Sequence, residues 1–171
     1  DFYNNPDRFA FQTQLFFLLS RYRQLQELNQ TDLFTKTLIT DYMFVKDRLF
    51  AALNLNDKEM SLYNSVATIL EKNVSAPDMV IFLQADTDRL MKNIRIRGRE
   101  YEKNIDWKYI DALSQVYNEY FFRYANSPLL IINTNDIDFV NNQDDLEEIV
   151  QFIRTPGEGT RYYNPIRNIE Q

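Results

Sequence analysis

The stretch IRIRGREYE, residues 94–102, gathers cationic side chains around a glycine. Arg95, Arg97 and Arg99 fall within five positions, and Gly98 stands between the last two. Planar guanidinium groups bind phosphate oxygens through paired hydrogen bonds and neutralise the charge of a phosphoryl group during its transfer. A solvated helix end, where cations complement the helix dipole, is the alternative. The cluster is therefore either a site for a small phosphate-bearing ligand or an ordinary surface.

A second group of polar residues lies in the first apolar segment of the chain. Gln14 and Arg21 are seven positions apart, so a helix would place both on one face among Phe and Leu residues. A buried arginine needs an anionic partner, for which Asp41 in LITDYMF is a candidate. A Gln amide beside an Arg–Asp pair can read the edge of a heterocyclic base, while Phe44 or Phe17 stacks on its face. A core ion pair that meets no ligand is the alternative.

Composition excludes several other kinds of chemistry. The 171 residues include neither Cys nor His, which rules out thiolate metal sites, Cys nucleophiles and imidazole bases within this chain. The net charge of −6 and the lack of a long basic stripe argue against a nucleic-acid partner. Apolar runs are far too short for a membrane span, so we expect a cytoplasmic protein. The length suits one domain.

Elements that could hold these residues alternate along the chain in the manner of an α/β domain with a parallel sheet. Asn5 and Pro6 open a helix that is apolar on nearly all sides from Phe9 to Leu19, which predicts its burial. Further helices are expected at residues 56–73, with a capping box, and at 87–97, 106–124 and 144–153. Gly98 is expected to end the helix at 87–97 in a left-handed conformation.

Strands are expected between these helices. The short β-branched run at residues 33–40 and the apolar runs at 79–83 and 129–133 fit strands, the last two buried on both faces of the sheet. If so, the arginines follow a strand and a helix, near the edge where open α/β sheets bind ligands. Residues 155–171 are expected to form a loop.

The segments YNNPDRFAFQTQLFFLLSRYRQL, TLITDYMF, PDMVIFLQADTDRLMKNIRIRGREYE and IINTNDIDFVNN, in this order, resemble the deoxynucleoside kinase family, in particular its bacterial deoxyadenosine/deoxycytidine kinase branch. The most distinctive piece is Arg-Gly-Arg-x-x-Glu, residues 97–102, which matches the family's lid motif. The resemblance implies a P-loop kinase-like, three-layer α/β/α fold with a parallel sheet. Residues 1–154 would form a partial kinase domain, followed by a tail at 155–171.

The resemblance also implies roles for individual residues. Arg97 and Arg99 would be the lid arginines that hold the phosphates of ATP, and Glu102 would accept a hydrogen bond from the sugar 3′-hydroxyl, shared with Tyr3. The remaining implied residues surround the two bases. They are Gln14, which pairs with the substrate base; Arg21 and Asp41, a pair that shapes its pocket; Phe44, which stacks on it; and Phe139, which lies near the adenine of ATP.

Two departures from the family pattern stand out. Thr35-Lys36-Thr37 occupies the place of an acid-Arg-Ser/Thr triplet, and lysine lacks the bidentate fork of arginine. The phosphate-binding loop GxxxxGK[ST] is absent, since the only glycines are Gly98, Gly157 and Gly159. We therefore expect the N-terminal strands, this loop and the general-base carboxylate to lie upstream of Asp1.

On this reading, the expected activity is transfer of the γ-phosphoryl group of ATP, with Mg²⁺, to the 5′-hydroxyl of a deoxynucleoside, deoxyadenosine before others. A thymidylate-type nucleotide kinase and a catalytically inactive nucleoside-binding or interaction module are the alternatives. The resemblance further implies a homodimer, packed through helices that include residues 39–54 and 57–73.

Overall fold

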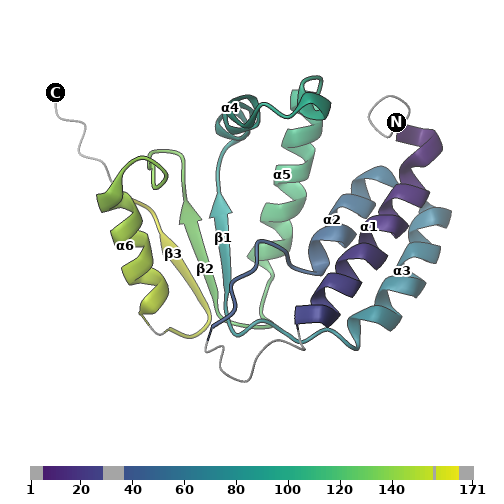
Figure 1. The fold of residues 1–171 in the computed structure, drawn as a ribbon, viewed down its shortest axis with the longest axis horizontal. Helices are drawn as coiled ribbons and strands as arrows, with labels where there is room; N and C mark the ends of the chain where they lie inside the picture. The colour runs from purple at the N-terminus through teal and green to yellow at the C-terminus, as the bar shows by residue number, and fades with distance from the viewer. Residues whose placement is uncertain (1–5, 29–36, 156, 166–171) are drawn as a thin grey trace. The chain divides into compact units, whose positions relative to one another are not determined.

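In the computed structural model, which describes residues 6–28, 37–155 and 157–165, the chain divides between Ser75 and Ala76 into two units (Figure 1). Unit 1 contains three helices, α1 (Pro6–Leu28), α2 (Val45–Asn54) and α3 (Asp57–Glu71). Unit 2 contains, in chain order, β1 (Val80–Gln84), α4 (Thr87–Arg97), the 3₁₀ helix η2 (Glu100–Glu102), α5 (Trp107–Phe122), β2 (Leu129–Asn133), α6 (Gln143–Arg154) and β3 (Thr160–Tyr163).

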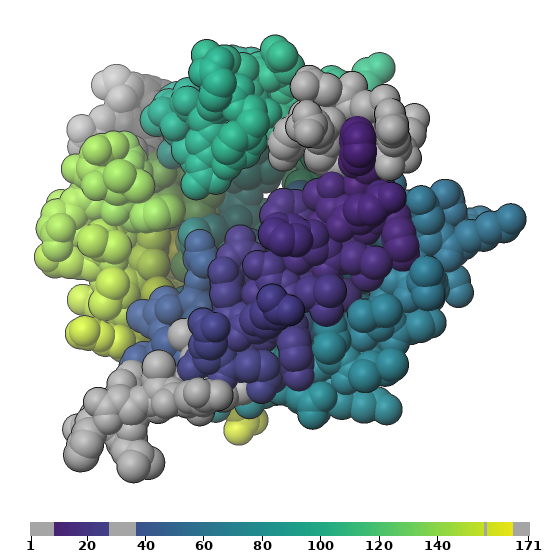
Figure 2. All heavy atoms as spheres, turned by 45° about the vertical axis from the view of Figure 1, so that its right-hand side comes forward, coloured from purple at the N-terminus to yellow at the C-terminus, as the bar shows by residue number. Residues whose placement is uncertain are grey.

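Helix α1 begins at Pro6, as expected from the sequence, but it is not buried on all sides. Ala10, Gln14 and Leu18 are buried, whereas Phe16 is 67% exposed and Phe17 is also exposed. Figure 2 shows atoms of α1, in purple, along the surface of unit 1. The expectation of a fully buried helix is wrong because α2 and α3 pack against one face only, which residues spaced four apart occupy.

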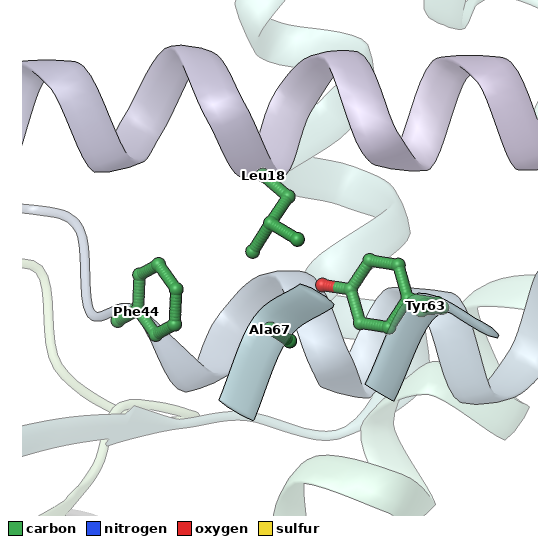
Figure 3. Packing of buried hydrophobic residues seen from close by; sticks show 5 residues of the cluster. Leu18, Phe44, Tyr63 and Ala67 are labelled. Carbon is green, nitrogen blue, oxygen red and sulfur yellow. The ribbon is translucent and has the colours of Figure 1, made fainter. Parts of the chain in front are cut away.

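The core of unit 1 joins all three helices. Its buried members are Leu18, Phe44, Ala51, Tyr63 and Ala67, four of which are labelled in Figure 3. Helix α3 enters this core in a fixed register because the predicted capping box forms at its start. In that box the side chain of Asn56 accepts from the backbone N–H of Glu59, and the carboxylate of Glu59 accepts from the N–H of Asn56.

Tyr63 is fully buried, yet its hydroxyl has no hydrogen-bond partner among the residues that the structure describes. Burial of an unpaired hydroxyl costs free energy that a phenylalanine ring of the same shape would avoid. We therefore expect Tyr63→Phe to raise the free energy of unfolding by about 1 kcal/mol in urea denaturation. A loss of stability on this substitution would reveal a partner for the hydroxyl.

Unit 2 is built on a parallel sheet of strand order β1-β2-β3. The register pairs Val80 with Leu129 and Leu129 with Thr160. The apolar runs that predicted β1 and β2 are confirmed as strands, and Leu129–Ile132 of the central strand are buried. In β1, however, Ile81 and Leu83 are exposed, so its predicted burial on both faces is wrong.

Helices cover both faces of this sheet, so unit 2 is itself a three-layer α/β/α structure (Figure 1). On one face Phe121 of α5 stacks on Phe82 of β1, with ring centroids 4.4 Å apart. On the other face Phe152 of α6 packs on Tyr163 of β3, also at 4.4 Å. The predicted α/β fold class is confirmed.

Two segments differ from the expectation. The tail was expected to be a loop, but Thr160–Tyr163 forms β3, whose Tyr-rich sequence suits a strand and whose partner β2 lies about thirty residues earlier. Residues 37–40 were expected in a strand but are exposed and irregular, and residues 33–36 lie outside the described part of the chain. Within the described ranges, no helix combines the length and apolar character needed to cross a membrane.

Candidate active site

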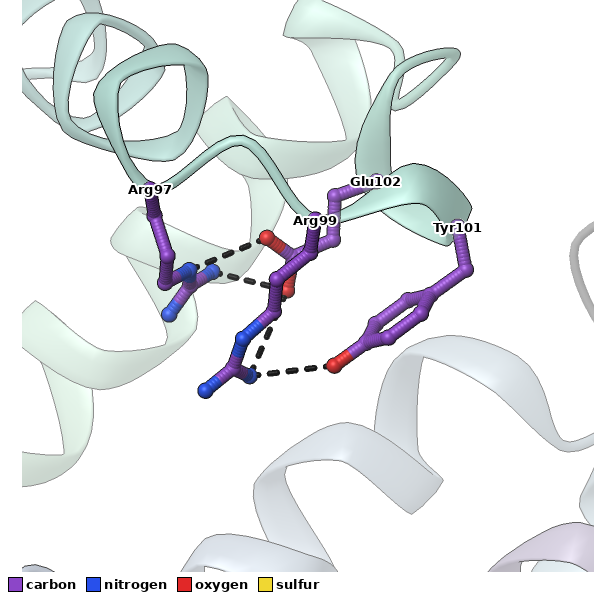
Figure 4. A network of polar contacts seen from close by, with 4 residues as sticks. All are labelled: Arg97, Arg99, Tyr101 and Glu102. Atoms are coloured by element: carbon purple, nitrogen blue, oxygen red, sulfur yellow. Dashed lines mark hydrogen bonds and ion pairs between the residues drawn. The ribbon is translucent and has the colours of Figure 1, made fainter.

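The arginine cluster of unit 2 is formed where α4 ends. Asp86 caps the start of α4 by accepting from the backbone N–H of Arg89, and Gly98 ends the helix with φ 63°. Only glycine adopts this left-handed conformation without a Cβ penalty, so the predicted helix end is confirmed. The chain then turns into η2, from which the side chain of Glu102 points back toward Arg97 (Figure 4).

A buried carboxylate joins the two arginines, as Figure 4 shows. Arg97 donates from Nε to Oε2 of Glu102 at 3.0 Å and from Nη2 to Oε1 at 2.8 Å, which is a bidentate pair. Nη1 of Arg99 lies 3.7 Å from the same Oε1 and donates to the hydroxyl of Tyr101 at 3.0 Å. Glu102 is 8% exposed, whereas the side chains of Arg97 and Arg99 are 48% and 52% exposed.

This arrangement leaves positive charge directed outward. Two guanidinium groups share one carboxylate, so the three side chains carry a net charge of +1 and keep N–H groups in contact with solvent. Such forks suit the oxygens of a phosphate chain. Arg95 is also exposed, but it is absent from the network drawn in Figure 4.

The sequence predicted the members of this cluster but not their pairing. Arg97 is the last residue of α4, as in the expected helix at 87–97, and Arg99 follows Gly98. The bidentate Arg97–Glu102 pair was not foreseen. The sequence feature that could have indicated this pair is a cation and an acid five residues apart, one on each side of the glycine that ends the helix. Whether the two side chains meet depends on how the chain turns after that glycine.

Phe139 lies in the loop between β2 and α6. Its ring is half-buried against the core that Leu130, Ile132 and Ile137 share with α6. Arg89 of α4 donates from Nη2 to the backbone oxygen of Ile137 at 3.1 Å, which ties this loop to the helix. A position of Phe139 beside the adenine of ATP stays a prediction.

Gln14 is the buried polar side chain of α1. It is 4% exposed, and its amide atoms are not among the fully buried polar atoms that lack a partner in the described ranges. The amide can offer one acceptor and two donors to a ligand. Its base-reading role stays a prediction.

The expected buried pair of Arg21 and Asp41 does not form. Nη1 of Arg21 donates to Oε1 of Gln24 at 2.8 Å, and its Cζ lies 5.2 Å from the ring centroid of Tyr42. Asp41 is exposed, and no ion pair joins it to Arg21 within the described residues. This expectation is wrong because Asp41 precedes α2 in an irregular segment, where Lys46 donates to its backbone oxygen at 3.2 Å.

The buried carboxylate of this region is Asp47, in the first turn of α2. It is 8% exposed and accepts a hydrogen bond from the hydroxyl of Tyr42. Burial raises the pKa of the Asp47 carboxyl, and the hydrogen bond from Tyr42 opposes that rise. Burial and the bond to Asp47 both raise the pKa of Tyr42, so the proton stays on the phenol. Sequence reasoning missed this pair.

The remaining predicted site residues are Phe44, Tyr3 and Lys36. Phe44 is buried in the core of unit 1 with Leu18, so its stacking on a base stays a prediction (Figure 3). Tyr3 and Lys36 lie outside the described residues. In the described ranges no group of three or more acidic side chains is placed to hold a metal ion. The use of Mg²⁺ stays a prediction.

Comparison with known proteins identifies the family that the sequence resembles. A model of the deoxynucleoside kinase family matches residues 1–156. A deoxyguanosine kinase of Bacillus subtilis is 29% identical over 160 residues, which make up 90% of this chain and 76% of that protein. A deoxyadenosine kinase of Dictyostelium discoideum is 28% identical over 169 residues, 97% of this chain and 66% of that protein.

Solved structures support the fold. A deoxyadenosine kinase from M. mycoides with bound dATP superposes with a TM-score of 0.74 at 21% sequence identity. The match covers 90% of this chain and 79% of the other. The same enzyme with bound dCTP gives a TM-score of 0.71 at 22% identity, over 89% of this chain and 76% of that chain.

Proposed function

Because this chain belongs to the deoxynucleoside kinase family, we propose that it transfers the γ-phosphoryl group of ATP to the 5′-hydroxyl of a deoxynucleoside, with deoxyadenosine preferred. The observation that carries the proposal is the pair of half-exposed guanidinium groups held around one buried carboxylate at the end of α4. Relatives named deoxyadenosine kinase and deoxyguanosine kinase support a purine deoxynucleoside as the acceptor.

The arginine cluster has the chemistry that phosphoryl transfer requires. In this reaction the 5′-oxygen attacks the γ-phosphorus, the bond to the β-phosphate oxygen breaks, and ADP leaves with the charge of that bond. Fixed positive groups stabilise this charge without reorganising during the step. Arg97 and Arg99 are proposed to supply them, which requires Arg97 to exchange at least part of its bond with Glu102 for phosphate oxygens.

Glu102 is then free to accept a hydrogen bond from the sugar 3′-hydroxyl. Its burial favours this role, because a carboxylate that loses an arginine partner in a dry site needs another donor. Gln14 and Arg21 are proposed to meet the base, and Tyr3 to share the 3′-hydroxyl. The acceptor of the 5′-hydroxyl proton is not assigned to any residue of this chain.

We also propose that the enzyme is a cytoplasmic homodimer that packs through α2 and α3, and that residues 1–154 act as one kinase domain. Exposed apolar side chains on α3, Leu62 and Ile69, support a packing surface on that helix.

A phosphorylation assay on the enzyme tests the proposal. Each of the four deoxynucleosides is incubated with ATP and Mg²⁺, and the 5′-monophosphates are separated by chromatography. We expect deoxyadenosine to give the highest kcat/KM, with a second deoxynucleoside phosphorylated more slowly. The matching ribonucleoside and thymidine monophosphate serve as controls for sugar recognition and for a nucleotide acceptor. Phosphorylation of thymidine monophosphate alone would contradict the proposal.

A further inference from the structure

One face of α1 carries a short row of residues that bears on base recognition. Gln14, Leu18 and Arg21 follow one another at spacings of four and three, so they lie on the same side of the helix. Leu18 is fully buried and anchors this face to the core of unit 1. Gln14 places a largely buried amide on this face. Arg21 supplies a cation about two turns further along.

The guanidinium of Arg21 rests on an aromatic platform. Its Cζ lies 5.2 Å from the centroid of the Tyr42 ring, a distance at which a cation is attracted to the ring face. Its one hydrogen bond among the described residues goes from Nη1 to Gln24. Arginine has five N–H donors, so most of them can point to a ligand.

Tyr42 is fixed in turn by Asp47. The hydroxyl donates to Oδ2 of Asp47, a buried carboxylate in the first turn of α2, so the ring is held at both ends of its side chain. Asp41 lies beside Tyr42 in sequence but is exposed, and its backbone oxygen accepts a hydrogen bond from Lys46. Asp47 therefore occupies the place in this network that the sequence assigned to Asp41.

We propose that Asp47 is a positioning residue for base recognition: through Tyr42 it fixes Arg21 on the face of α1 that carries Gln14, and it thereby sets which base is preferred. The inference rests on the proposed kinase function. It concerns how the base site is ordered rather than which residue touches the base.

The hydrogen-bonding chemistry of Gln14 and Arg21 explains why the position of the guanidinium affects base preference. The amide of Gln14 can donate and accept, so it can pair with more than one base by turning over. Arginine only donates, and a guanidinium held in one place therefore favours a base whose nearby edge presents acceptors. Without the Tyr42–Asp47 bond the platform is released, and Arg21 samples other rotamers at the cost of selectivity.

Steady-state kinetics of the enzyme with all four deoxynucleosides test this role. We expect Tyr42→Phe and Asp47→Asn each to change the ratio of kcat/KM for deoxyadenosine over the next substrate by about fivefold or more, mainly through KM. Asp57→Asn, at the exposed start of α3, is the control for a lost acid in the same unit, and it should leave the ratio unchanged.

The possible results distinguish the proposed kinase function from the positioning role of Asp47. A wild-type enzyme that phosphorylates no deoxynucleoside removes the proposed function and this inference with it. An active enzyme whose ratio is unaffected by Tyr42→Phe, while the protein stays folded by circular dichroism, overturns the positioning role alone. Asp47→Asn removes a buried charge and can lower stability. If the Asp47 variant fails to fold, the result for Tyr42→Phe alone decides the positioning role. A shift in the ratio for Asp41→Asn but not for Tyr42→Phe would return the role to Asp41.

Discussion

Replacement of Arg97 or Arg99 by alanine is expected to lower kcat by about 100-fold or more, the scale of a group that stabilises charge in a transition state. Each variant removes a guanidinium from the only described arrangement in which two arginines share one buried carboxylate. Arg97→Ala has a second effect, since Glu102 loses its bidentate partner and stays buried. Single-turnover measurements at saturating ATP and deoxyadenosine separate this loss of kcat from weaker binding.

Arg95→Ala is the matched control for both variants. Arg95 is an exposed cation of the same helix, two residues before Arg97, so its removal changes net charge equally. We expect it to change kcat by less than about threefold, as for an exposed charge that contacts no reacting group. Equal, small effects at all three arginines would mean that the cluster is a solvated helix end.

Replacement of Gln14 by leucine is expected to lower kcat/KM for the preferred deoxynucleoside by roughly 1 to 3 kcal/mol, or about fivefold to 150-fold. Leucine fills a similar volume, so the core of unit 1 stays packed, but the base would lose the amide partner that we propose. The affinity for ATP, measured by equilibrium titration, should not change, because Gln14 is proposed to face the acceptor alone.

Gln12→Leu is the control for this effect. Gln12 is exposed on the same helix, and its replacement removes an amide without touching the buried face. Normal kinetics of the Gln14 variant with every deoxynucleoside would rule out the base site described above. A loss of stability without a kinetic effect would identify Gln14 as a structural residue.

Elements with local signals could be predicted from the sequence. Helix α3 carries its capping box in Asn56 and Glu59, and α4 carries its end in Gly98, so each boundary depends on residues within one turn of it. Strands β1 and β2 are apolar runs between turn residues, so they could also be predicted from the sequence. The members of the arginine cluster were predictable because they lie within six positions.

Features that depend on distant partners could not be predicted in the same way. Strand β3 exists because β2 offers it an edge, which no residue near Thr160 reveals. The choice of Asp47 over Asp41 as the buried acid depends on where α2 begins and on which side of it meets Tyr42. The exposure of Phe16 and Phe17 likewise depends on how many helices surround α1 in unit 1.

Strand β3 determines where the fold can be cut at its carboxyl end. A protein shortened after Arg154 would keep every residue discussed for chemistry but would lose Thr160–Tyr163, the strand paired with one side of β2. The central strand would then become an edge, with unpaired N–H and C=O groups beside the apolar run Leu129–Ile132. Exposed strand edges of this kind pair with strands of other molecules. A minimal form of the enzyme must therefore extend at least through Tyr163.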